Sequence, residues 1–438
     1  MKQMHLAAFL IAGNGAHSHA LWRHPEATLE FLQPELYQSI AQILERGKFD
    51  LVFFADRLAV SDRYGLNLKV GVEFGDQDAT RMDPIPILSL MSGCTSSIGL
   101  GATRSTTYHH PYHVARTFAT LDHLSRGRAA WNVVTSMNDA EARNFGVDRH
   151  LEHGDRYDRA DEFLQVCFKL WDSWEPDALQ LNQKTGRYAD PAKVHYIDHV
   201  GQWFQSKGPL NIPRSPQGRP VIIQAGSSGR GKEFAARWAE VIFTVQPDSA
   251  SMKTFYQEVK SQLREVGRNP EHCKILPAVM PFIGDTEAEA REKQALHNDL
   301  VHPLVGLSTL SSHANYDFSQ HALDEPLASI ESRGTKGLLQ AVRHLAQAEK
   351  LSLGEVGKLY GQSVLAPQIV GTPTQVADQL ETLFRDRVCD GFVISPAYLP
   401  GTFAEFVDRV VPELQQRGIF RHDYAEGTLR DRLQLDTQ

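Results

Sequence analysis

The sequence predicts an α/β protein, a TIM (β/α)8 barrel with long insertions after its fourth and seventh units. Short apolar runs alternate with longer amphipathic segments almost from end to end of the 438 residues. Strands that are apolar along their whole length are typical of sheets buried on both faces, and alternation with helices implies parallel pairing. Eight such strand–helix units favour a closed barrel over an open doubly wound sheet.

Each unit joins one apolar run to one helical segment. The helical spacing is clear in residues 34–47, where Leu36, Ile40, Ile43 and Leu44 recur on one face. The expected strands and helices, in chain order, are 4–12 with 34–47, 51–55 with 85–94, 98–102 with 112–124, 129–134 with 156–171, 221–225 with 231–238, 241–245 with 251–266, 275–283 with 286–300, and 391–394 with 403–417.

Two stretches do not fit this repeat. Residues 173–219, rich in Pro, Gly and Asn, follow the fourth unit, and residues 302–371 follow the seventh and contain a helical piece at 336–349. Long insertions of this kind usually cover a binding site. We therefore expect both to be lids on a single domain spanning residues 1–438. The charged tail 420–438 is expected to wrap the outside of the barrel or an oligomer partner.

Composition and charge narrow the function classes. The formal net charge of −8 argues against nucleic acid or an anionic membrane as a partner, because both reward a concentrated basic surface. No apolar run approaches the roughly 20 residues that span a bilayer, and the run at 6–12 is interpreted as a buried first strand rather than a secretion signal. The four cysteines, which form no C-x-x-C pair, indicate reduced thiols in a cytoplasmic protein.

In a TIM barrel the functional side chains stand at the C-terminal ends of the strands. Those positions hold mostly hydroxyls, amides and imidazoles: His17, His19, Asp56, Arg57, Thr103, Thr135, Ser136, Gln246 and Ser395. Such a set suits a polar-edged aromatic ring better than acid–base hydrolysis. Phe53 and Phe243 lie near strand ends, where an aromatic side chain is either barrel core or the wall of an apolar pocket.

The glycine-rich loop Gly226-Ser-Ser-Gly-Arg-Gly231 joins a strand to a helix. Its free N–H groups and the helix dipole face one point, which predicts an anion site, with Ser227 and Ser228 as further donors. The loop matches neither the dinucleotide fingerprint nor the Walker pattern. A glycine turn that caps a helix is the alternative interpretation. Tyr157 either donates its phenol to a phosphate or caps a helix.

The pair His17 and His19 invites a metal interpretation. A metal site needs three or four converging ligands, and the other strand ends supply none, so we expect no metal. His109, His110 and His113 lie together at a helix start, where capping and exposure to solvent explain them.

Seven short stretches, spread over nearly the whole chain, carry a resemblance to a known family. They are Ala20-Leu-Trp-Arg-His-Pro25, Gly47-Lys-Phe-Asp-Leu51, Thr106-Thr-Tyr108, Trp131-Asn-Val-Val-Thr-Ser136, Asn144-Phe-Gly146, Glu152-His153 with Arg156-Tyr-Asp158, and Gln224-Ala-Gly226. Together they resemble the nitrilotriacetate-monooxygenase branch of the luciferase-like flavoproteins. Residues 138–146, 190–196, 213–218, 307–313 and 390–396 are similar to the members of that branch that cleave C–S bonds of aromatic sulfones.

The chain departs from those members in three places. Ala55 stands where they have proline, residues 105–110 are less apolar, and residues 317–363 differ more widely. These positions border the expected pocket. The resemblance therefore implies the reaction class more firmly than the substrate.

The resemblance implies a two-component monooxygenase that takes FMNH2, by diffusion, from a separate flavin reductase. It would use O2 to oxidise a small apolar aryl sulfone with C–S cleavage, as a homodimer or homotetramer. The implied roles are Asp56, Thr103, Thr135 and Ser136 around the flavin ring, Tyr157, Gly226, Ser227 and Ser228 around the FMN phosphate, His17, Ser136 and His313 in catalysis, and Phe53 and Phe243 against the substrate.

Other hypotheses stay open. An alkane, an alkyl sulfide, a sulfonate or an amino-polycarboxylate would suit the same chemistry, although a polycarboxylate calls for more basic residues than Arg57 and Arg104. A deazaflavin-dependent dehydrogenase of the same superfamily would transfer hydride without O2. A flavin-storage protein would bind FMN without turnover.

Overall fold

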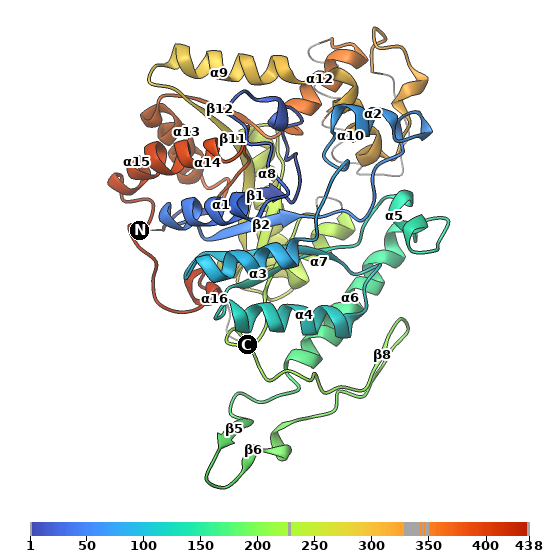
Figure 1. The fold of residues 1–438 in the computed structure, drawn as a ribbon, viewed down its shortest axis with the longest axis vertical. Helices are drawn as coiled ribbons and strands as arrows, with labels where there is room; N and C mark the ends of the chain where they lie inside the picture. The colour runs from blue at the N-terminus through green and yellow to red at the C-terminus, as the bar shows by residue number, and fades with distance from the viewer. Residues whose placement is uncertain (1, 227–228, 328–341, 344–345, 347–349, 436–438) are drawn as a thin grey trace.

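Eight parallel strands form a closed barrel in the computed structural model, which describes residues 2–226, 229–327, 342–343, 346 and 350–435 (Figure 1). The strands are β1 (His5–Ile11), β2 (Leu51–Ala55), β3 (Gly99–Ser105), β4 (Ala129–Val134), β9 (Val221–Gln224), β10 (Val241–Thr244), β11 (Lys274–Ile283) and β13 (Gly391–Ile394). They are hydrogen-bonded in that order, and β13 pairs back with β1. The predicted TIM barrel is confirmed.

The strands are buried along almost their whole length. Every residue of β1, β11 and β13 is buried, as expected for strands covered on both faces. Three strands, β2, β4 and β13, have the bounds that the sequence predicts. The other five begin and end within three residues of the predicted positions.

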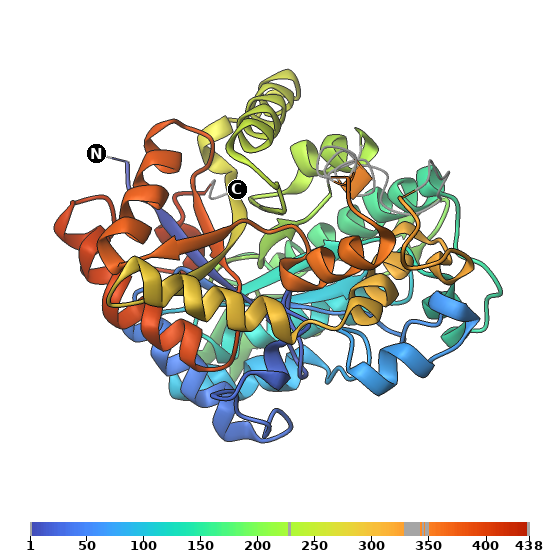
Figure 2. The ribbon, with the colours of Figure 1, turned by 90° about the horizontal axis from the view of Figure 1, so that it is seen from above.

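Helices lie outside the strands in both views of the ribbon (Figures 1 and 2). They are α1 (Pro34–Arg46), α3 (Pro84–Cys94), α4 (Pro111–Leu124), α6 (His153–Trp171), α7 (Gly229–Trp238), α8 (Ser249–Glu265), α9 (Glu287–Leu300) and α13 (Pro373–Arg385). His110 caps α4, because its side chain accepts the N–H of Tyr112. None of the described helices is long and apolar enough to cross a membrane.

The eighth unit differs from the prediction. The expected helix 403–417 is divided into α14 (Gly401–Glu405), a π-helical turn (Phe406–Val410) and α15 (Val411–Gln416). Pro412 lies just after the wide turn, and it has no backbone N–H with which to continue the α-helical pattern. Helix α13 and the strand β12 (Gln368–Gly371) were not predicted at all. β12 pairs with the second half of β11, beyond the barrel.

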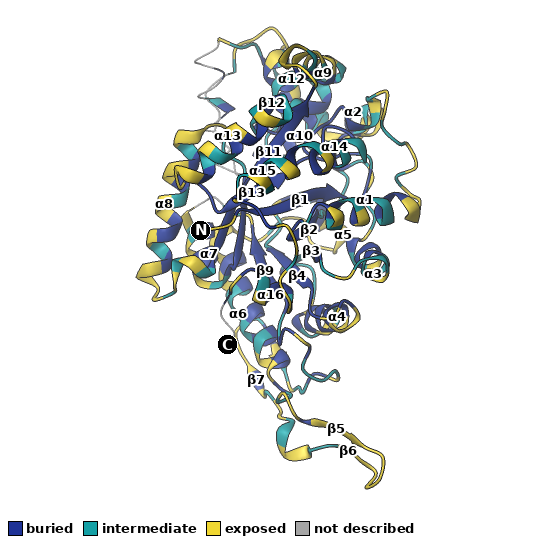
Figure 3. Ribbon diagram, turned by 90° about the vertical axis from the view of Figure 1, so that its left-hand side faces the viewer, coloured by how far each residue is buried: buried dark blue, intermediate teal, exposed yellow. Residues whose placement is uncertain are grey.

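The first insertion forms two small hairpins. Strands β5 (Leu179–Asn182) and β6 (Arg187–Ala189) form one, and β7 (His199–Val200) and β8 (Gln205–Ser206) form the other. The β5–β6 hairpin projects from the barrel and is mostly exposed (Figure 3). No described residue of 173–219 lines the large cavity described below, so the prediction that this insertion is a lid is wrong.

The second insertion lies at the C-terminal end of the barrel. Its helices α10 (Pro303–Ala314) and α12 (Leu353–Ser363) pack on each other, and α10 also packs on α2 (Lys69–Phe74). The α10–α12 crossing is close, because a Cβ on Gly306 would lie 1.8 Å from the carbonyl oxygen of Gly357. The predicted helical piece at 336–349 lies almost wholly outside the described residues.

The C-terminal tail covers the N-terminal end of its own barrel. Leu429, at the start of α16 (Leu429–Arg432), is fully buried near Gly99 of β3. Arg430 forms an ion pair with Glu240, and the Arg421 guanidinium lies 2.6 Å from Asp50. The buried part of the tail therefore packs on the end of its own barrel, and contact of its exposed residues with an oligomer partner stays a prediction.

Candidate active site

A cavity of about 680 Å³ opens at the C-terminal ends of the barrel strands. Small-molecule and cofactor sites occupy about 300–1,000 Å³, so the cavity has room for a ligand of that kind. Its lining includes every described residue to which the family resemblance gave a role: His17, Phe53, Asp56, Thr103, Thr135, Ser136, Tyr157, Gly226, Phe243 and His313. Two of the other strand-end candidates, His19 and Ser395, do not line the cavity. Ser227 and Ser228 lie outside the described residues.

Aromatic rings form one wall of the cavity. Phe9 lies with its ring centroid 5.5 Å from Phe243 and 5.7 Å from Phe53. His17 stacks on Phe9 at 4.0 Å, with an angle of 17° between the rings. The wall includes Phe53 and Phe243, as predicted, and adds Phe9. It presents flat apolar surface to a ligand.

His17 is held by Ser395, which follows β13. Its Nδ1 lies 2.8 Å from the Ser395 Oγ. Burial, with a smaller contribution from the neighbouring His19, lowers the pKa of His17 to about 3, so the imidazole is neutral at pH 7. His19 turns away from the cavity and contacts Thr309 Oγ1 at 2.6 Å. The two histidines therefore do not converge on one point, and no group of three metal-ligating side chains occurs among the described residues.

His313 enters the cavity from helix α10. Its Nδ1 lies 2.6 Å from the Tyr360 hydroxyl, and its Nε2 lies 2.9 Å from the Gln77 amide nitrogen. Burial holds the pKa of His313 well below its usual value, and the nearby Arg57 guanidinium acts in the same direction. A second neutral imidazole therefore faces the ligand space, fixed from both sides.

The cations of the lining are paired with carboxylates. Asp78 accepts from Arg57 at 2.5 Å and from Arg81 at 2.8 Å. The Lys232 ammonium lies 2.5 Å from Glu258. The cavity therefore offers an incoming anion little uncompensated positive charge among its described residues.

Asp56 is the carboxyl group at the end of β2. Burial raises the pKa of Asp56 to about 6, although Arg81 and Arg104 oppose that shift. The carboxylate accepts the backbone N–H of Arg57 at 2.8 Å. A carboxyl group with a pKa this close to neutral can hold or release a proton near a ligand.

Hydroxyls and amides from β3 and β4 form the polar side of the cavity. Ser136 has a positive φ of 55°, and its Oγ lies 3.1 Å from a Glu141 carboxylate oxygen. Residues other than glycine adopt this backbone conformation only at a cost in free energy, and such strain often occurs at functional sites. Thr135 lines the cavity beside it. Thr103 donates to the carbonyl oxygen of Phe54 at 2.9 Å and accepts from the Asn132 amide at 2.8 Å.

The predicted phosphate site begins at the end of β9. The Gly226 N–H donates to the Gln224 side chain at 2.6 Å. Tyr157 lines the cavity next to it, and its ring lies 5.4 Å from that of Phe234 on α7. Arg230, at the start of α7, is held by Asp158 and Asp161 at 2.9 and 2.7 Å.

Several lining residues were not predicted. Phe9 is one, because an aromatic residue inside a strand is more often core than pocket. Its position two residues before Ile11, another lining residue, places it on the same inward face of β1. Gln77 comes from an irregular segment and Glu141 from the short helix α5 (Asp139–Asn144). Neither segment has a periodic pattern of apolar residues from which its position could be predicted.

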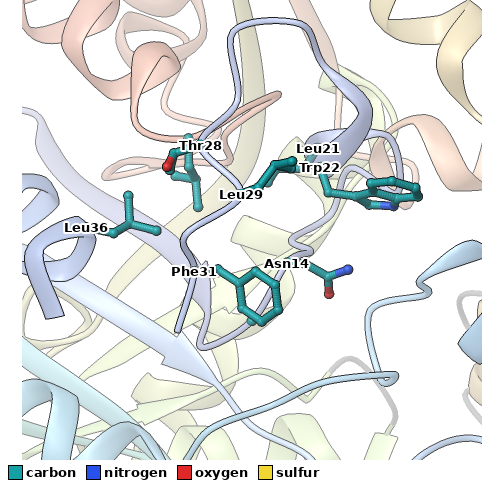
Figure 4. Close-up of a pocket in the computed structure, with 9 residues that line it drawn as sticks. Asn14, Leu21, Trp22, Thr28, Leu29, Phe31 and Leu36 are labelled. Carbon is teal, nitrogen blue, oxygen red and sulfur yellow. The ribbon is translucent and has the colours of Figure 1, made fainter. Parts of the chain in front are cut away.

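A second, smaller cavity of about 80 Å³ lies beside the segment that joins β1 to α1. Its lining is almost wholly apolar and includes Leu21, Phe31 and Leu36 (Figure 4). It contains no titratable side chain and is too small for a cofactor. The large cavity is therefore the candidate site.

Comparison with known proteins agrees with this geometry. The family model of luciferase-like monooxygenases matches residues 13–390. Dibenzothiophene-sulfone monooxygenase of Rhodococcus erythropolis (strain XP) is 52% identical over 99% of this chain and 97% of its own length. Nitrilotriacetate monooxygenase component A of Aminobacter aminovorans is 43% identical, over 99% and 97%. The structure of riboflavin lyase with modified FMN and its substrate riboflavin matches at a TM-score of 0.90 and 34% identity, covering 99% of this chain and 96% of that one. The chain therefore belongs to the luciferase-like monooxygenase family and is a flavin-dependent monooxygenase.

Proposed function

We propose that this protein is the oxygenase component of a two-component system that oxidises a small apolar aryl sulfone with C–S cleavage. The observation that carries the proposal is the aromatic wall of Phe9, Phe53 and Phe243 beside a neutral His17. A flat heterocycle stacks on such a wall, and a relative with 52% identity is named for a sulfone of that shape.

The proposed cofactor is FMN, bound as FMNH2 from a separate flavin reductase. The lining suits it, since the cavity combines an aromatic wall, strand-end hydroxyls and Gly226, the first residue of the strand-to-helix glycine stretch. Asp56, Thr103, Thr135 and Ser136 would lie around the ring, and Tyr157, Gly226, Ser227 and Ser228 around the phosphate. Bound FMNH2 supplies the electrons with which O2 is activated. A relative named component A supports delivery of FMNH2 by a second protein.

The side chains of this chain would position the substrate and exclude water. The aromatic wall would hold the ring, and the apolar lining around it would keep bulk water from the reacting atoms. His17 and His313 would both face the ligand as neutral imidazoles at pH 7, because burial lowers the pKa of each. Ser395 and Tyr360 fix the orientation of the two imidazoles.

The charge of the lining favours an apolar substrate over an amino-polycarboxylate. Arg57, Arg81 and Lys232 are each paired with a carboxylate. An alkane, an alkyl sulfide or a sulfonate is the alternative within the same chemistry. The two relatives described above are both named monooxygenases, but they are named for different substrates. They therefore support the reaction class and leave the substrate open.

We further propose that residues 1–438 form one domain that assembles as a homodimer or homotetramer. Both insertions leave and rejoin the same barrel. The β5–β6 hairpin exposes apolar side chains, with Leu181 58% and Tyr188 66% accessible, as is common at a protein interface.

The balance of the reaction gives a direct test. Opening an aryl sulfone to a phenol and a sulfinate adds the elements of water to the substrate. If one oxygen atom of O2 enters the product and the second oxygen atom leaves as water, the reaction consumes four electrons. These correspond to two molecules of NADH.

The experiment measures O2 uptake by the purified protein with FMN, NADH and a general flavin reductase, with and without dibenzothiophene sulfone. We expect sulfone-dependent uptake, two NADH per sulfone opened, and label from ¹⁸O2 in the phenol. Label from H2¹⁸O instead would contradict monooxygenation. Uptake that yields only H2O2 would remove the sulfone as substrate.

Replacing His313 tests its proposed catalytic role. In His313→Ala we expect turnover to fall by about 100-fold or more, with FMN affinity close to that of the wild type. His321→Ala is the matched control, since His321 lies in the same insertion but not in the cavity lining. Full coupled turnover in His313→Ala would remove His313 from the mechanism.

A further inference from the structure

Lys232 is a cationic residue of the cavity lining to which the proposed function gives no role. It lies on α7, and its ammonium group is 2.5 Å from the Glu258 carboxylate and 5.7 Å from the ring centroid of Phe255, both on α8. The other cations of the described lining are Arg57 and Arg81. Among the described lining side chains, only these three could give an anionic ligand a counter-charge, because the two lining histidines are neutral.

The three cations differ in how firmly their carboxylate partners hold them. Asp78, the partner of both arginines, has a side chain that is only 1% exposed. Drawing a cation away from it would leave a buried charge without a partner, which is strongly destabilising. The Glu258 side chain is 48% exposed, so water can solvate its carboxylate, and an exposed ion pair contributes little stability. Lys232 is therefore the lining cation that a ligand can recruit.

Lys232 stands next to the positive end of a helix. α7 begins at Gly229, so Lys232 is in its first turns, and side chains on a helix lean towards the N-terminus. The flexible four-carbon stem of lysine lets the ammonium group turn between Glu258 and that end. Gly226, which comes just before α7, lines the same cavity. The N–H groups of a helix start and an ammonium group together suit an anion with several acceptor oxygens.

The part of the lining that α8 contributes is polar and partly open to solvent. Ser251, Thr254 and Glu258 line the cavity there, and Thr254 and Glu258 are exposed. The aromatic wall, in contrast, is buried. A ligand with a flat ring and a charged tail would therefore place its ring on the wall and its tail beside α7 and α8.

We propose that Lys232 leaves Glu258 to bind the phosphate of FMN, and that Glu258 pairs with this cation when no anion is bound. The inference rests on the proposed use of FMN. Riboflavin has the same ring but no phosphate, so the exchange of partners gives the site a preference for FMN over riboflavin. An aryl sulfone has no net charge and would leave the Lys232–Glu258 pair intact.

The test is the ratio of the dissociation constants for riboflavin and FMN, measured apart from turnover. Quenching of flavin fluorescence on the purified apoprotein gives both constants, and anaerobic titration gives those of the reduced flavins. In Lys232→Gln we expect FMN and FMNH2 to bind about tenfold more weakly, the effect of a lost charge-assisted hydrogen bond. The affinity for riboflavin should stay within twofold of the wild type.

Two further variants serve as controls for the loss of charge. Lys232→Arg keeps the charge and should keep the preference for FMN. Lys253→Gln removes a charge from an exposed residue of α8 that does not line the cavity, and it should change neither affinity. A loss of FMN affinity in Lys253→Gln equal to that in Lys232→Gln would show an effect of net charge alone and contradict the assignment.

Glu258→Gln tests the exchange of partners itself. It removes the carboxylate that competes for Lys232, so we expect FMN to bind about threefold more tightly, consistent with the small contribution of an exposed ion pair. In the Lys232→Gln background the same substitution should give a smaller gain. An equal gain in both backgrounds would mean that the two side chains act independently, which would contradict the exchange.

The outcomes separate this inference from the proposed function. An unchanged preference for FMN in Lys232→Gln would overturn the inference and leave FMN as the cofactor. Equal binding of FMN and riboflavin by the wild type would overturn it in the same way. Wild-type protein that binds neither FMN nor FMNH2 would contradict the proposed function.

Discussion

His17 is neutral because it is buried, and this neutrality has a consequence for stability. Its pKa in the folded protein is about 3, and the pKa of the buried His19 is about 4. An unfolded histidine titrates near 6.5. Below that pH the unfolded chain takes up protons that the folded chain does not, so the folded state loses stability as the pH falls from 6.5 towards 3.

We expect His17→Gln to remove part of this acid sensitivity. Between pH 7 and pH 5, one such histidine accounts for about 2 kcal/mol of lost stability. Urea unfolding at the two pH values should show a difference smaller by that amount in His17→Gln than in the wild type. A variant at the exposed His422 is the control, and an unchanged pH dependence in His17→Gln would contradict the burial argument.

Ser136 combines a strained backbone with a hydroxyl in the cavity. Ser136→Gly and Ser136→Ala both remove the contact with Glu141, but only glycine relieves the positive φ. We expect the glycine variant to be more stable than the alanine variant by about 1 kcal/mol. Chemical unfolding of the two variants measures this, and equal stability would show that the backbone here is not strained.

The candidate site was predictable where the chain has regular structure. Strand-end positions gave His17, Asp56, Thr103 and Ser136, because the barrel places the ends of all its parallel strands at one rim. Gln77 was not predictable, since it comes from a loop whose course depends on tertiary contacts. Phe9, Asn132 and other inward residues of the strands require the register of each strand, which an all-apolar run does not reveal.

Among the elements, the crossing of α10 and α12 positions His313. The two helices touch at Gly306 and Gly357, where a methyl group on Gly306 would meet backbone. We expect Gly306→Ala to destabilise the protein by about 2 kcal/mol and to lower turnover by displacing His313. Gly93→Ala on α3 is the matched control, because nothing lies within 4 Å of its added methyl group.

In thermal unfolding, Gly93→Ala should be neutral or stabilising by about 0.5–1 kcal/mol, the ordinary gain of alanine over glycine inside a helix. If Gly306→Ala matched it, the close contact between α10 and α12 would not matter for stability.

The elements themselves divide into predictable and unpredictable sets for a physical reason. Buried parallel strands such as β2 and β4 are apolar throughout, so their bounds are evident in the sequence. β12 is short and only half buried, and its pairing with the far end of β11 gives no local signal. The hairpins of the first insertion are mostly exposed, so they lack the alternation that identifies a half-buried strand.

For the whole molecule, the projecting β5–β6 hairpin is the feature that bears on assembly. An isolated two-stranded hairpin is marginal in water, so a partner surface would stabilise it. We expect the double substitution Leu181→Asp and Tyr188→Asp to lower the oligomeric state in light scattering, without changing the content of helix and strand. Val266→Asp, at another exposed apolar residue, is the control. An unchanged mass would show that the hairpin does not hold the oligomer together.

The pairing of β1 with β13 also governs how the chain is made. The first strand to leave the ribosome must wait for the last before the barrel can close. At about 5–20 residues per second, the roughly 380 residues between them take tens of seconds. During that time β1, whose seven residues are mostly apolar, presents an open edge to other nascent chains. Slower synthesis lengthens this exposure, so we expect the yield of native protein to depend on chaperones that cover the N-terminal segment during translation.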